Sequence, residues 1–128
     1  MIVCVKVVAA KVAVTSHVGD FSARWVGDPR PKSGDCIDVE VSLGHHSLTW
    51  GADICAAPVG AERGLIERDG TYIMTGLAKG ADEGGGLFVL VAPDCLVLLT
   101  VGGACPRDLD ETLVVARSDI CELYPTNL

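Results

Sequence analysis

The stretch Ile37-Asp38-Val39-Glu40-Val41-Ser42-Leu43 decides the fold class of this chain. Its apolar residues alternate strictly with polar ones, which is the pattern of a β-strand with one face in the core and the other in water. Val and Ile also favour extended backbone. We therefore predict a strand here. We expect Gly44-His45-His46 to end it, and Leu48 to Trp50 to resume it as a hairpin.

The first apolar run, upstream of this strand, has an internal conflict of parity. Val3, Val5 and Val7 share one face of an extended chain, whereas Val12 and Val14 have the opposite parity. A bulge near residues 8–10 would turn both sets toward the core and bend one long strand. The alternatives are a strand buried on both faces, or two strands with a break.

Turn residues separate the remaining apolar runs. We expect residues 51–66 to form a loop with a helical turn, and Asp69-Gly70 to form a hairpin turn. Further strands are predicted at 21–25, 65–66, 72–74, 87–92, 96–101 and 112–124, the last as one strand or a pair. The run 87–92 is also a candidate edge strand. The sequence thus predicts an all-β chain, residues 1–128 forming a single β domain. We expect a small barrel or sandwich of about seven to nine mostly antiparallel strands with little helix.

The six cysteines lack the spacing of a disulfide framework or a zinc site. Cys4, Cys95 and Cys121 lie in or beside apolar runs, where a free cysteine behaves as a small buried hydrophobe. We expect a basic leader and a membrane-spanning run to be absent. Together these observations favour a reduced, cytoplasmic protein, and a disulfide-bonded protein is the alternative.

Charge is distributed unevenly along the chain. Residues 81–128 hold eight acidic and two basic residues, whereas residues 1–80 hold nine and eight, and the net charge is −7. An acidic surface attracts a basic partner and repels nucleic acid and anionic membranes. We expect the partner-binding residues in this region. The main group is Asp108, Asp110 and Glu111, and the second group is Asp82, Glu83 and Asp119.

Metal and catalytic motifs are weak. His45 and His46 could share a metal in a turn, with Asp53 or His17 as a further ligand, but we predict a polar hairpin tip and neither metal nor cofactor. Ser16-His17 and Ser47 lack the setting of an activated nucleophile. The carboxylate pairs Asp38/Glu40 and Asp108/Asp110 suit acid–base chemistry only if one member is desolvated.

Phosphate and nucleic-acid binding have little support. Gly84-Gly85-Gly86 follows two acidic residues, which argues against a phosphate cradle. Phe21, Arg24 and Trp25 could supply part of a single-strand binding face. A pI of about 4.7 is far from the basic footprint of such proteins, and we expect Phe21 and Trp25 to pack in the core.

Several segments resemble small bacterial all-β proteins of the immunity or inhibitor type, as found in contact-dependent growth inhibition and similar toxin systems. The resembling stretches are 21–25, 31–35 leading into 38–40, Trp50-Gly51 and the tail 122–128. Such proteins share no common signature, so the resemblance assigns no functional residue.

The resemblance implies a non-enzymatic protein that covers a basic, nuclease-like toxin domain. Separately, the candidate edge strand 87–92 could pair with a second copy, which predicts weak self-association. The alternatives are a small-ligand or single-stranded nucleic-acid-binding barrel, or a small enzyme.

Overall fold

The computed structural model describes residues 1–44, 47–81, 86–103, 106, 108–109 and 111–126. Twelve strands make up the fold, more than the seven to nine expected: β1 (Ile2–Val8), β2 (Lys11–Ser16), β3 (Gly19–Trp25), β4 (Cys36–Leu43), β5 (Leu48–Thr49), β6 (Ile54–Ala56), β7 (Gly64–Arg68), β8 (Thr71–Ala81), β9 (Gly86–Ala92), β10 (Cys95–Gly102), β11 (Leu113–Ser118) and β12 (Cys121–Pro125). The described residues contain no helix, so none of them forms a helix that could cross a membrane. The all-β prediction is confirmed.

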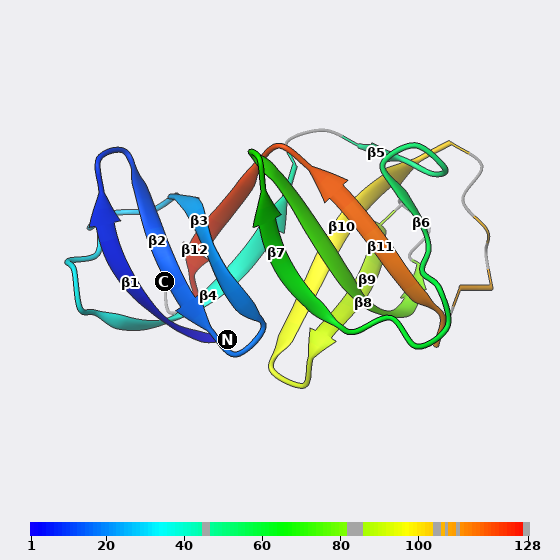
Figure 1. The fold of residues 1–128 in the computed structure, drawn as a ribbon, viewed down its shortest axis with the longest axis horizontal. Coiled ribbons are helices and arrows are strands. Elements are labelled where there is room, and N and C mark those ends of the chain that lie inside the picture. The colour runs from blue at the N-terminus through cyan, green and yellow to red at the C-terminus, as the bar shows by residue number, and fades with distance from the viewer. Residues whose placement is uncertain (45–46, 82–85, 104–105, 107, 110, 127–128) are drawn as a thin grey trace.

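The strands form a closed barrel and a second, strongly curved sheet, which lie side by side in Figure 1. The barrel has the order β1-β2-β3-β12-β4 and is closed by the pairing of β1 with β4. The second sheet has the order β5-β10-β9-β8-β11-β6, and β7 also pairs with β8. Most pairs are antiparallel, as expected, but β3–β12 and β5–β10 are parallel.

The first apolar run is two strands rather than one bent strand. Ala9 and Ala10 form a tight turn, and Ala9 has φ 54°. The hairpin pairs Val5 with Val14 and Val7 with Val12. Cross-strand partners point to the same face of a sheet. The valines of the two strands therefore point toward the same side, although their positions in the sequence have opposite parity. The expected bulge is therefore wrong, and the alternative of two strands with a break is correct.

Two other local expectations are corrected. β5 does not form a hairpin with β4, because it pairs in parallel with the end of β10. β9 is not an edge strand, since it has β10 on one side and β8 on the other. The predicted hairpin at Asp69-Gly70 is confirmed as the β7–β8 connection. The region expected to be a loop, 51–66, contains β6 and the start of β7, and it opens with a single helical turn in which the N–H of Asp53 donates to the carbonyl oxygen of Thr49 at 2.8 Å.

A close backbone contact joins the barrel to the second sheet. The N–H of Leu65 on β7 donates to the carbonyl oxygen of Val18, in the β2–β3 turn, at 2.9 Å. Gly19 follows as the first residue of β3, and a Cβ atom at Gly19 would lie 2.0 Å from the carbonyl oxygen of Leu65. Beside this contact, the Glu67 carboxylate accepts hydrogen bonds from the Ser22 backbone N–H and hydroxyl, both at 2.8 Å. The Tyr72 hydroxyl donates to the Ser22 carbonyl.

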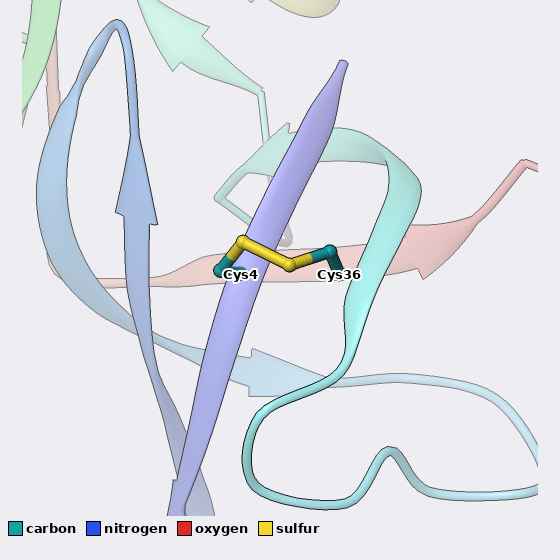
Figure 2. The surroundings of a disulfide bond; sticks show 2 residues. All are labelled: Cys4 and Cys36. Carbon is teal, nitrogen blue, oxygen red and sulfur yellow. A yellow bond between two sulfur atoms is a disulfide. The ribbon is translucent and has the colours of Figure 1, made fainter.

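One disulfide links β1 to β4 at the seam that closes the barrel. Cys4 and Cys36 are direct cross-strand partners and are bonded through their sulfur atoms, as Figure 2 shows. Both residues are exposed to solvent. The expectation that the cysteines are reduced is therefore wrong for this pair, and Cys4 is not a buried hydrophobe. Cys95 and Cys121 are free and buried, as expected.

The close approach at Gly19 predicts a large penalty for an added methyl group. We expect Gly19→Ala to lower the free energy of unfolding by about 2 kcal/mol or more beyond any effect of Gly80→Ala. Gly80 is the matched control because it also has a positive φ, but no atom lies within 4 Å of its would-be Cβ. Urea titration of both variants measures the difference. Equal destabilisation would show that the turn can move away from β7.

The barrel seam predicts a stability loss when the disulfide is removed. The bond spans 32 residues of sequence separation, for which chain entropy gives about 3–4 kcal/mol. We expect Cys4→Ser/Cys36→Ser to lose about this free energy of unfolding. The denatured wild-type protein should show two more thiols after reduction than before it, by Ellman titration. An unchanged thiol count would mean that this bond is not formed.

Candidate functional site

Three of the six predicted acidic site residues lie among the described residues: Asp108, Glu111 and Asp119, all exposed. Asp82, Glu83 and Asp110 fall outside the described residues. Glu111 precedes β11 and Asp119 follows it, and the six-residue strand separates them by about 20 Å. Glu111 and Asp119 therefore lie at opposite ends of one strand.

The segment around Glu111 is anchored to the second sheet. Leu109 is buried, and its carbonyl oxygen accepts the N–H of Thr112 at 2.9 Å. The N–H of Glu111 donates to the carbonyl oxygen of Ala78 on β8 at 2.7 Å. Asp108 and Glu111 thus flank a buried anchor and point to solvent.

Part of the negative charge in this segment is already paired. The Lys79 ammonium forms an ion pair with the Glu111 carboxylate, and both side chains are substantially exposed. An exposed pair of this kind contributes about 0–1 kcal/mol, so a cationic partner can compete with Lys79. Asp108 has no such ion pair among the described residues.

Asp119 lines a small polar cleft. The cleft has a volume of about 370 Å³ and also includes Asp53, Arg117 and Ser118. The Asp53 carboxylate accepts the Thr49 N–H at 2.8 Å, and the Ser118 hydroxyl oxygen accepts the Ile120 N–H at 3.1 Å. These two side chains therefore hold local turns, whereas Asp119 and Arg117 supply exposed charges of opposite sign.

The described residues do not assemble the metal site considered from the sequence. His45 and His46 lie outside them, and Asp53 is bonded to backbone. His17 bonds through Nε2 to the Asp94 carboxylate at 2.8 Å. Figure 1 places the β2–β3 turn, which holds His17, and the β5–β6 connection, which holds Asp53, in different halves of the molecule. No group of three or more metal-ligating side chains occurs in the described part.

The other side chains considered for catalysis have ordinary structural roles wherever the structure describes them. The Ser16 hydroxyl donates to the Gly19 carbonyl at 2.6 Å, which does not activate it. Asp38 accepts a hydrogen bond from the Met1 ammonium at 2.8 Å, and this bond holds its pKa below the usual value. Asp38 and Glu40 are both exposed, which confirms the expectation of a solvated face.

The aromatic residues of the nucleic-acid alternative are not available for stacking. Phe21 and Trp25 are both buried in the barrel core, as expected. Arg24 lies on the outer face, where its Nε is 3.9 Å from the largely buried carboxylate of Glu122. This strand therefore offers neither the exposed aromatic rings nor the unpaired cations that bind single strands.

Sequence reasoning missed a groove where the barrel meets the second sheet. It has a volume of about 560 Å³. Glu40, Ser42 and Tyr124 form one wall, and Phe88, Leu96 and Leu98 form the other. The available signal was the sequence of β10, whose outward positions carry leucine where alternation predicts polar residues.

Comparison of the chain with protein-family models, with curated proteins and with solved structures returned no match.

The buried thiols predict low reactivity, which bears on the thiol-enzyme alternative. Burial raises the pKa of Cys121 to about 12 and that of Cys95 to about 11, so at pH 8 the thiolate fractions are about 10⁻⁴ and 10⁻³. We expect iodoacetamide to modify the half-buried Cys55 at least ~100-fold faster than either residue, as measured by peptide mass spectrometry. Reaction at Cys95 and Cys121 should rise about tenfold per pH unit. Rapid modification of Cys121 at pH 8 would contradict its assignment as an inert core residue.

Proposed function

We propose that this protein is a non-enzymatic binding protein of the immunity type, which neutralises a basic bacterial toxin domain. The observation that carries the proposal is the anchored segment in which the buried Leu109 presents Asp108 and Glu111 to solvent. It lies within the third of the chain that carries most of the net charge of −7. Acidic side chains held in place are suited to occupy a basic cleft and mimic phosphate.

The charges would act at two stages of binding. Exposed carboxylates attract a cationic partner over a distance of about 10 Å at 0.1 M salt and so raise the association rate. Those that become desolvated in the complex lower the dissociation rate. Glu111 exchanges its Lys79 partner for a cation of the toxin, so its net gain is smaller than that of Asp108.

A second candidate function is binding of a small polar ligand in the cleft that contains Asp119 and Arg117. The opposite charges of these two side chains favour a zwitterionic or hydrogen-bonding ligand. Asp119→Asn separates the two functions, because it removes a charge from the cleft and leaves the Asp108–Glu111 segment unchanged.

The cytoplasmic location stays a prediction. The Cys4–Cys36 disulfide weighs against it, because disulfides persist mainly in oxidising compartments. Trapping thiols with an alkylating reagent in intact cells of the native host, before lysis, measures the redox state of this pair directly.

The proposal predicts a specific effect of neutralising the main group of acids. The partner is first identified by mass spectrometry after affinity capture from the native host, and is then purified. We expect one equivalent of the wild-type protein to inhibit the partner's activity. Asp108→Asn/Asp110→Asn/Glu111→Gln should weaken binding by about 2–5 kcal/mol if the charges are desolvated, or mainly slow association if they lie at the rim.

Glu62→Gln is the charge control, because this exposed residue lies in the loop before β7. It should leave inhibition unchanged. A partner that keeps full activity when saturated with the protein would contradict the immunity function. A triple variant that binds with wild-type affinity and association rate, at low and high salt, would exclude this segment as the binding site.

A further inference from the structure

Four of the six large apolar side chains that are exposed in the described residues gather on two surfaces. Leu96 and Leu98 on β10 are 53% and 51% exposed, and Ile2 and Val8 on β1 are 63% and 53% exposed. The first pair lies in the groove described above, and the second pair lies on the outer face of the barrel. Leu96 and Leu98 are neighbours on one face and form a contiguous apolar surface, which commonly marks an interaction site, whereas about 20 Å of strand separates Ile2 from Val8.

The groove is apolar on one wall and carries a carboxylate on the other. Leu98 pairs across the sheet with Phe88, and both line the groove. Glu40, on the opposite wall, is exposed and forms no ion pair with any described residue. A complementary surface would therefore combine an apolar side chain with a cation.

The outer face of β1 has this combination. Ile2, Cys4, Lys6 and Val8 follow the alternation of an extended strand and are all exposed. Lys6 lies between the two apolar residues and has no ion pair among the described residues. The disulfide at Cys4 ties this strand to β4, so the face is held in place.

Within one molecule Lys6 and Glu40 cannot meet. Ile2 pairs with Asp38, so the Ile2 end of β1 lies beside the β4 wall of the groove, and the strand runs from there away from the second sheet (Figure 1). Lys6 pairs with Ala13 at the end of β1 that is remote from Glu40, because only residues 2–4 of β1 pair with β4. Any contact between them must be made by a second copy of the chain.

We propose that the groove between β4 and β10 binds the outer face of β1 of a second copy, with Lys6 of one molecule paired to Glu40 of the other. The leucines of β10 would cover Val8. The contact uses two different surfaces, so it is heterologous and leads to a ring or an open chain of copies. It involves no residue of the Asp108–Glu111 segment and stands independently of the immunity function.

The net charge of −7 keeps this association weak, since every copy repels the next. Added salt screens that repulsion and the Lys6–Glu40 pair together, so a salt series alone is uninformative. Charge reversal separates the two effects, because the double reversal restores both the pair and the net charge.

The experiment is sedimentation velocity of the purified chain from about 10 µM to 1 mM, a range that covers weak association. We expect the wild type to show a sedimentation coefficient that rises with concentration. Lys6→Glu and Glu40→Lys should each weaken association at least ~tenfold, and the double variant should recover to within about threefold of the wild type. Leu98→Ser should weaken it comparably through loss of apolar burial.

The matched controls are Arg63→Glu and Glu62→Lys, which make the same charge changes at neighbouring exposed positions. Each should follow the wild type apart from the general effect of net charge. A wild type that stays monomeric at the highest concentration would overturn the proposal. A double variant that associates no better than the weaker of the two single variants would also overturn it. The same holds if charge reversal at residues 62 and 63 weakens association as much as reversal at residues 6 and 40.

Discussion

The insertion of β12 between β3 and β4 is the contact on which the rest of the structure depends. It closes the first barrel with a strand from the end of the described chain, parallel to β3 and antiparallel to β4. Leu123, at its centre, is fully buried, and its carbonyl oxygen accepts the N–H of Val26 at 2.9 Å. The whole second sheet lies between β4 and β12 in sequence. The pairing of β12 with β3 and β4 is therefore non-local, and such pairing makes folding slow.

The junction between the barrel and the second sheet is closely fitted on one side only. β3 contacts β7, and β4 contacts β10, so the second sheet is held on both sides of β12. At the β3 side the backbone approaches closely at Gly19, and the Glu67 carboxylate is bonded to Ser22. At the β4 side no ladder forms, and the groove remains. The exposed leucines of β10 line the groove on the β4 side.

Local sequence patterns predicted the strands but not their partners. Alternation located β3 and β4, continuous apolar runs located β9 and β10, and Asp69-Gly70 located a hairpin. The change of parity marked a break near Ala9-Ala10, but the turn has no glycine, proline or asparagine, so nothing distinguished a turn from a bulge. β5 and β6 are two and three residues long, too short for any periodic signal. The Cys4–Cys36 pairing follows from barrel closure, which a sequence separation of 32 does not reveal.

For the candidate site too, the sequence predicted which residues are involved but not how they are arranged. Counting charges identified the acidic third of the chain, but only the structure shows that Glu111 is paired with Lys79 and that Asp119 belongs to a separate cleft. Figure 1 shows the start of β11, next to Glu111, at the end of the molecule away from the barrel. A basic partner bound there would leave β1 and the groove accessible. Self-association and partner binding can therefore coexist, and copies held together through β1 would present several acidic segments at once, which raises avidity for a multivalent partner.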